Sequence, residues 1–274
     1  MFNMNINLKF LCCGAAVWLG CFPQSVTAQC AVTDCLQLGY TSLEKCDNGL
    51  KCPFGEYWAC PAPKEEKAIL GECTGYAQNC QIGQILNSDG TCSDYRVNGV
   101  EPVGVVAYIG TDNCGQALAL ETLKKDAIDG IAWSREKVDI PGLKNSDGKT
   151  DFDSCKNTQT VLDYSYKAYG DSASSYYPAF WNAHDYTPSS APLTKGKWCL
   201  PAGGVLVNVY KNIDAINLGF TRIAAESFGG NHYLWSSSQY SPDEAMSWQF
   251  RWNSLTTTNK LTDRYHGVRF VIEF

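Results

Sequence analysis

Between residues 238 and 266 the sequence concentrates aromatic, guanidinium, amide and imidazole side chains, which are the groups that dominate binding surfaces. Aromatic rings and arginine supply a large contact area at a low cost in conformational entropy, and amides supply adaptable hydrogen bonds. The residues that we expect to contact a ligand are Tyr240, Gln249, Arg251, Trp252, Asn253, Arg264 and His266. An ordinary solvated strand is the alternative interpretation of this segment, and the sequence leaves it open.

Residues 248–253 alternate aromatic with polar side chains, as expected for a strand that has one face on a core. We expect Phe250 to face that core. The side chains expected at the surface are Gln249, Arg251, Asn253 and, at the strand end, Trp252. Trp235 follows Leu234 in an apolar run, so it is expected in the core.

Catalytic motifs are not found in the chain. Three histidines, His184, His232 and His266, occur without a Gly-x-Ser-x-Gly elbow, a His-Glu-x-x-His pair or a glycine-rich phosphate loop. We therefore expect a protein that is not an enzyme and that needs no cofactor.

Oxygen ligands of the kind that Ca²⁺ prefers occur close together in the sequence at Asn145, Asp147, Asp151 and Asp153. Their spacing is not that of an EF-hand and its terminal Glu is missing, so a turn rich in Asx residues is the better interpretation. The chain also has no Cys-x-x-Cys pair, which zinc and iron–sulfur sites usually contain. We expect no metal site.

The start of the chain has the pattern of an export signal. Lys9 precedes an apolar stretch at residues 10–22, and small residues ending at Ala28 form a cleavage site. The competing interpretation is a lipoprotein whose anchor is Cys21. We expect residues 1–28 to be a signal peptide, and the protein to be secreted, at the cell surface or in the periplasm.

The chain carries a formal net charge of −6, which argues against a nucleic-acid partner. No later segment is apolar enough for a transmembrane helix. A glycosaminoglycan-type ligand fits this charge only if basic side chains cluster locally. The candidates for such a cluster are Arg251, Lys260, Arg264 and Arg269.

Cysteine density changes sharply along the chain. Eight of the 14 cysteines lie between Cys30 and Cys92, which indicates a small disulfide-stapled module at residues 29–97 in an oxidising compartment. Their connectivity is open. An odd number of cysteines follows the signal peptide, so at least one is expected to be unpaired or bonded to another chain, and we expect it among Cys114, Cys155 and Cys199.

The remaining residues, 98–274, predict an α+β domain. Strands are expected at 103–109, 117–120, 233–238, 246–252 and 267–274. Helices are expected from Thr158 to a stop at Gly170, over 177–186 and over 206–217. The last strand is apolar enough to be central, and we expect it to pair with the first strand near Val103.

An ordered set of short motifs spans residues 103–274. They are Gly-Val-Val-Ala-Tyr at 104–108, Ile-Pro-Gly-Leu-Lys-Asn at 140–145, Asp-Phe-Asp at 151–153, Trp-Cys-Leu-Pro at 198–201, Tyr-Lys-Asn at 210–212, Leu-Trp-Ser-Ser at 234–237 and Val-Arg at 268–269. Together they resemble the bacterial C-type-lectin-like domain of collagen-like adhesin C-termini and of large surface-protein paralogue sets. One departure is Val205, which stands where the family usually has an acidic residue.

The resemblance implies a fold with paired termini, two helices and a sheet face used for recognition. The same fold is similar to the diversified receptors of retroelement systems and, distantly, to formylglycine-generating enzymes, whose reactive cysteine pair has no matching motif here. It implies an exported, non-enzymatic recognition or adhesion protein that binds a protein or a glycan. The alternative is a structural envelope or pilus-associated subunit, anchored to the envelope through the cysteine-rich module.

Overall fold

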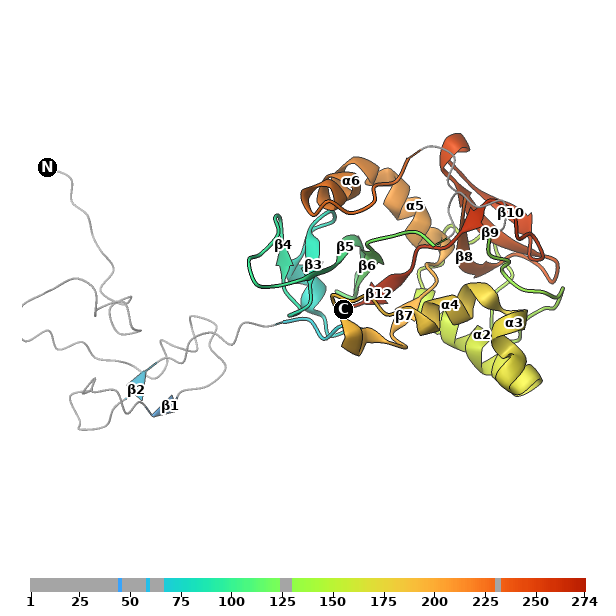
Figure 1. The fold of residues 1–274 in the computed structure, drawn as a ribbon, viewed down its shortest axis with the longest axis horizontal. Helices are drawn as coiled ribbons and strands as arrows, with labels where there is room; N and C mark the ends of the chain where they lie inside the picture. The colour runs from blue at the N-terminus through green and yellow to red at the C-terminus, as the bar shows by residue number, and fades with distance from the viewer. Residues whose placement is uncertain (1–43, 46–57, 60–66, 124–129, 230–232) are drawn as a thin grey trace, which may run out of the picture. The chain divides into compact units, whose positions relative to one another are not determined.

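The computed structural model describes residues 67–123, 130–229 and 233–274, together with two short strands, β1 (Glu44–Lys45) and β2 (Trp58–Ala59), which pair antiparallel (Figure 1). One compact unit comprises Lys67–Phe274. It begins well before the boundary predicted near residue 98. The predicted signal peptide and the first five cysteines after it lie outside the described residues.

The fold of this unit is α+β, as predicted, with two sheets. The larger sheet has the strand order β4-β3-β5-β6-β12-β7. Its strands are β3 (Ile85–Asn87), β4 (Cys92–Ser93), β5 (Pro102–Ile109), β6 (Gly115–Ala119), β7 (Trp198–Cys199) and β12 (Val271–Glu273). β3 and β4 extend the sheet from β5, and all three strands belong to the unit Lys67–Phe274.

The smaller sheet has the strand order β10-β9-β8-β11. Its strands are β8 (Tyr233–Gln239), β9 (Glu244–Gln249), β10 (Ser254–Asn259) and β11 (His266–Gly267). The first three form an antiparallel meander, and β11 runs parallel to β8 at the edge.

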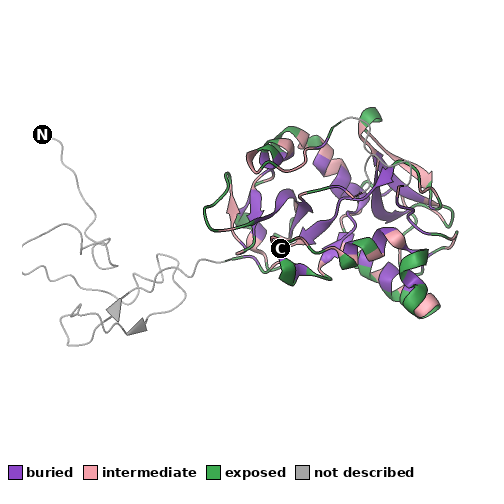
Figure 2. Ribbon diagram, in the orientation of Figure 1, coloured by how far each residue is buried: buried purple, intermediate pink, exposed green. Residues whose placement is uncertain are grey.

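Helices cover both faces of the six-stranded sheet (Figure 1). They are α2 (Ser154–Tyr169), α3 (Ala173–Tyr176), α4 (Pro178–Asp185), α5 (Gly203–Lys211) and α6 (Ile213–Arg222). One hydrophobic core contains residues of α2 and α4 with Val106 of β5, and the other contains residues of α5 and α6 with Val105. Side chains alternate between the faces of a strand, so β5 is buried on both sides (Figure 2).

Two helix boundaries differ from the prediction. Thr158 does not begin its helix, because α2 starts one turn earlier at Ser154. Inside the helix the Thr158 hydroxyl donates to the Ser154 carbonyl oxygen (2.9 Å) and accepts from the Leu200 amide (3.0 Å). The predicted helix over 206–217 is divided at Asn212, which ends α5 and begins α6. Gly170 follows α2 as predicted.

The last strand is central, as predicted, but its neighbour is not β5. β12 pairs antiparallel with β6 on one side and with β7 on the other. The reason is that β6 folds back on β5 as a hairpin and occupies the position beside it. The start of the unit meets the end in a different way, because the Gly71 amide donates to the Glu273 carbonyl oxygen at 2.7 Å.

Three disulfides staple the described part of the chain: Cys73–Cys114, Cys80–Cys92 and Cys155–Cys199. The prediction that the odd cysteine is one of Cys114, Cys155 and Cys199 was therefore wrong, since all three are bonded. Pairing depends on spatial proximity, and the sequence spacing could not show that Cys73 lies beside Cys114. The disulfides are consistent with an extracellular or surface location. Within the described residues, no helix is both long and apolar enough to cross a bilayer.

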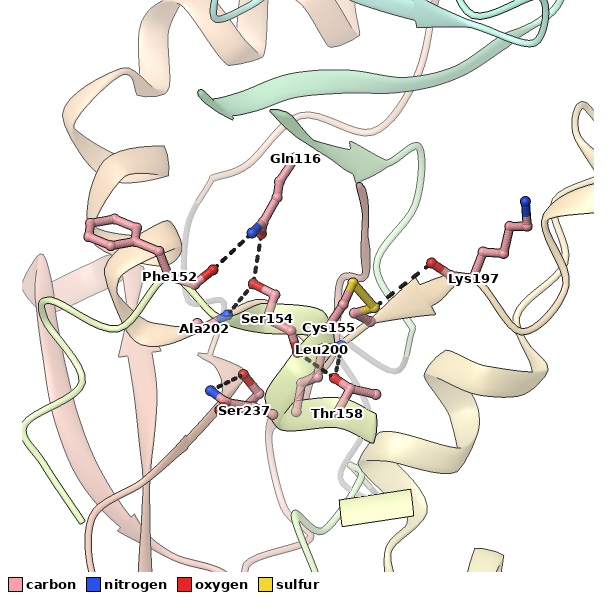
Figure 3. Close-up of a disulfide and its surroundings, with 11 residues drawn as sticks. Gln116, Phe152, Ser154, Cys155, Thr158, Lys197, Leu200, Ala202 and Ser237 are labelled. Atoms are coloured by element: carbon pink, nitrogen blue, oxygen red, sulfur yellow. Dashed lines mark hydrogen bonds between the residues drawn. A yellow bond between two sulfur atoms is a disulfide. The ribbon is translucent and has the colours of Figure 1, made fainter. Parts of the chain in front are cut away.

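The Cys155–Cys199 bridge lies in a polar cluster at the start of α2 (Figure 3). The Ser154 hydroxyl donates to Oε1 of Gln116 (2.7 Å) and accepts from the Ala202 amide (2.8 Å). These bonds join α2 to β6 and to the segment that leads into α5. The bridge adds a covalent link from the same turn of α2 to β7.

Replacing Cys155 and Cys199 together by Ala is expected to lower the free energy of unfolding by about 4 kcal/mol, because the bridge closes a long loop of the unfolded chain. The sequence separation is 44 residues, against 12 for Cys80–Cys92. Removing the shorter bridge should therefore cost about 3 kcal/mol. Urea unfolding of both variants measures the difference, and a larger loss from the shorter loop would contradict this account.

Candidate functional site

Most of the predicted ligand contacts gather at one end of the four-stranded sheet. The pairing of its strands places Ser254, Gln249, Tyr233 and His266 in one row across β10, β9, β8 and β11. Beyond this row the chain turns from β9 into β10, and it enters β11 through Arg264 and Tyr265. The row therefore brings the segments near residues 250 and 265 to the same end of the sheet.

The turn between β9 and β10 is a short 3-10 helix, Phe250–Trp252. It ends the alternation that was predicted to continue through residue 252, and it exposes Arg251, Trp252 and Asn253 as expected (Figure 2). The Trp252 side chain is 62% exposed. The Arg251 guanidinium lies 5.1 Å from the centre of the Trp252 ring, in a cation–π contact.

The base of this hairpin is packed against the core. Trp248 is buried and its ring centre lies 5.2 Å from that of Tyr210 in α5. Phe250 was predicted to face the core; it is half-buried, and its ring stacks on Phe228 with 4.9 Å between centres. Packing of this kind holds the turn in place, while the side chains of residues 251–253 stay exposed.

We call the exposed residues Arg251, Trp252, Asn253, Arg264 and Tyr265 the hairpin end. Tyr265 is 56% exposed, and it was not among the predicted ligand contacts although it directly follows Arg264. The available signal was its place just before a short edge strand, where side chains need not alternate into a core.

The other predicted contacts lie elsewhere. Tyr240 is exposed, but it follows the last residue of β8 and so lies at the opposite end of the sheet from Trp252. Gln249 is half-buried in the row itself. Tyr240 and the hairpin end are separated by the length of β9, roughly 20 Å for six residues, so the structure divides the predicted set.

His266 lies beneath the surface. It is 6% exposed, and its ring stacks on Trp235 with 4.4 Å between centres. Its Nδ1 lies 3.0 Å from the carbonyl oxygen of Arg264, while Nε2 is buried and has no hydrogen-bond partner among the described residues. Burial lowers the pKa of His266, because the charged imidazolium loses its solvation. Trp235 is fully buried, which confirms its predicted place in the core.

Two of the four candidate basic residues are internal. Nζ of Lys260 donates to Oε1 of Gln239 (2.6 Å) and to the Val138 carbonyl oxygen (2.8 Å), and desolvation lowers its pKa to about 8. Arg269 donates to the carbonyl oxygens of Ala119 and Glu226. The predicted cluster of four cations is therefore reduced at the surface to Arg251 and Arg264.

The candidate calcium ligands form turns. Oδ1 of Asp147 accepts from the Lys149 amide (3.2 Å), and Oδ1 of Asp151 accepts from the Asp153 amide (3.1 Å). Both bonds span two residues, which is the geometry of an Asx turn. Oδ2 of Asp151 also accepts from the Ser238 hydroxyl at 2.6 Å, so this carboxylate helps to join the turn to β8.

The burial of His266 predicts a dependence of stability on pH. In the unfolded chain His266 takes up a proton as the pH falls through 6.5, whereas in the folded chain its lowered pKa keeps it neutral to a lower pH. The contribution of His266 to the free energy of unfolding is therefore fully present above pH 6.5 and is lost as the pH falls below it. Replacing His266 by Phe keeps a ring on Trp235 and removes the titration. Chemical unfolding at pH 8 and pH 5 should show a larger loss for the wild type than for H266F; equal losses would contradict the assignment.

Comparisons with known proteins show a distant structural likeness. No family model matches the chain, and no curated protein matches it. Among solved structures, a crystal structure of a fimbrial protein from Bacteroides ovatus aligns with a TM-score of 0.49 and 15% identity, over 71% of this chain and 49% of that one. The match thus spans about half the length of the fimbrial protein, and the likeness is distant.

Proposed function

We propose that the chain is an exported, non-enzymatic recognition protein that binds a protein or glycan ligand through the hairpin end. The observation that supports this most is Trp252, a large aromatic side chain left 62% exposed beside Arg251 at the tip of a well-packed hairpin. Tryptophan and arginine are the residues most enriched among the energetic hot spots of binding surfaces. Neither side chain stabilises the core, so their exposure fits a role toward another molecule.

Rigidity of the scaffold supports the same proposal. The ring stack of Phe250 on Phe228 and the burial of Trp248 hold the tip at one place relative to the sheet. A ligand that binds there pays little to order the backbone, because only the outer side chains lose freedom.

We further propose that the compact unit is a C-type-lectin-like domain. Its support is the ordered set of motifs, the hydrogen bond that joins Gly71 to Glu273 near the two ends of the unit, and the second sheet that carries the hairpin end. The unit begins at Lys67, so the domain is longer than the predicted 98–274, and it contains more helices than the two expected.

Replacing Trp252 by Ala in the full-length mature chain is expected to weaken binding about 30-fold, the loss typical of a hot-spot aromatic. Binding is measured on arrays of immobilised glycans and of extracellular proteins. Y166A is the matched control, because Tyr166 is 60% exposed but lies on α2. Both variants should unfold at the wild-type temperature. Equal loss in both, or no loss in W252A, would count against the hairpin end.

A structural subunit of the envelope or of a pilus is the second candidate. The Bacteroides ovatus structure to which the chain is distantly similar is that of a fimbrial protein. In this role the chain should be recovered with surface appendages sheared from cells, and W252A should be recovered equally well. Recovery of the chain only in the culture medium would contradict the subunit role and leave the recognition role in place.

A further inference from the structure

The hairpin end carries two arginines whose charges are not neutralised. No ion pair joins Arg251 or Arg264 to a carboxylate of residues 67–123, 130–229 or 233–274. The acidic residue next to Arg264 in sequence, Asp263, pairs instead with Arg135 at 3.0 Å. Both exposed guanidinium groups thus keep their donors available, in a chain whose net charge is −6.

Each arginine is followed directly by an exposed aromatic residue. The two pairs are Arg251-Trp252, in the turn after β9, and Arg264-Tyr265, just before β11. β8 separates β9 from β11, so the pairs are two strand spacings apart, roughly 10 Å. The hairpin end therefore repeats one pair of residue types, an exposed arginine followed by an exposed aromatic residue, at two points along this end of the sheet.

Resting on the proposed function, we propose that the hairpin end binds an acidic polysaccharide, with each arginine–aromatic pair holding one carboxylated sugar. The apolar face of a sugar ring packs on an aromatic side chain by dispersion. A carboxylate attached to that ring meets the neighbouring guanidinium, whose fork matches two carboxylate oxygens.

A polysaccharide fits this surface better than an acidic protein does. The end of the four-stranded sheet is about 15 Å wide. This is narrow for a stable protein–protein interface, which buries about 800 Å² on each partner. An acidic polymer also presents the same ring and carboxylate at regular intervals, which suits two similar pairs. In a protein ligand, ring and carboxylate come from separate flexible side chains.

The test uses the full-length mature protein and three acidic polysaccharides with different backbones: polygalacturonate, alginate and hyaluronate. Their methyl esters keep the backbone and remove the charge. Titration calorimetry should show binding of at least one acid, about tenfold weaker binding of its ester, and about tenfold weaker binding of the acid by R264Q. K167Q is the control, because Lys167 is an exposed cation on α2, and it should bind as the wild type does.

The outcomes separate this inference from the proposed function. Equal binding of acid and ester, both lost in W252A, would overturn the acidic ligand and keep recognition by the hairpin end. Binding of an acidic protein but of no polysaccharide, if it is lost in W252A, would also overturn the polysaccharide ligand and keep recognition by the hairpin end. Acid binding unchanged in R264Q and W252A would place the polysaccharide elsewhere and overturn the inference. A loss of binding in Y166A equal to that in W252A, for every ligand tested, would overturn the proposed function itself.

Discussion

The constraint on which the structure depends is that the six-stranded sheet is covered by helices on both faces. Strand β5 must supply apolar side chains to two cores at once, and Val105 and Val106, neighbours in sequence, serve different cores. This leaves no place for charge in the centre of the sheet and explains the continuous apolar run of β5. The four-stranded sheet is placed by the same two cores, since Leu234 belongs to one and Trp235 to the other.

A buried cation connects this layered core to the hairpin end. The Arg269 guanidinium lies 3.9 Å from the ring centre of Phe220 and 4.5 Å from that of Phe228, and it donates to the Ala119 carbonyl oxygen of β6 at 2.8 Å. Phe228 in turn stacks on Phe250, the first residue of the turn that carries Trp252. The contacts of a buried guanidinium with aromatic faces and carbonyl oxygens depend strongly on direction, so they fix the orientation of the groups involved. The position of the exposed tip is thereby tied to the central sheet.

Local patterns predicted what depends on local sequence. The apolar run at Leu234 placed Trp235 in the core, the helical period predicted most of α2 and α5, and the alternation of residues 248–253 placed Arg251 and Asn253 at the surface. These features follow from side-chain periodicity, which needs no knowledge of the partner element.

Features that depend on distant partners were not predictable in this way. The neighbour of β12, the pairing of Cys73 with Cys114 and the start of the compact unit each depend on segments that meet only in the folded chain. His266 looked like a contact residue because imidazole is polar, and its burial against Trp235 depends on the parallel pairing of β11 with β8. The separation of Tyr240 from the hairpin end follows from the direction of β9, which the spacing of residues 240 and 252 does not reveal.

The disulfides have a consequence for the protein under mechanical load. Cys73–Cys114 and Cys155–Cys199 close loops with sequence separations of 41 and 44 residues, and Cys80–Cys92 lies within the first loop. When the two ends of the compact unit are pulled apart, the chain inside these loops adds no length while the bridges are intact. The unit can therefore extend by only part of its contour length before a covalent bond carries the force.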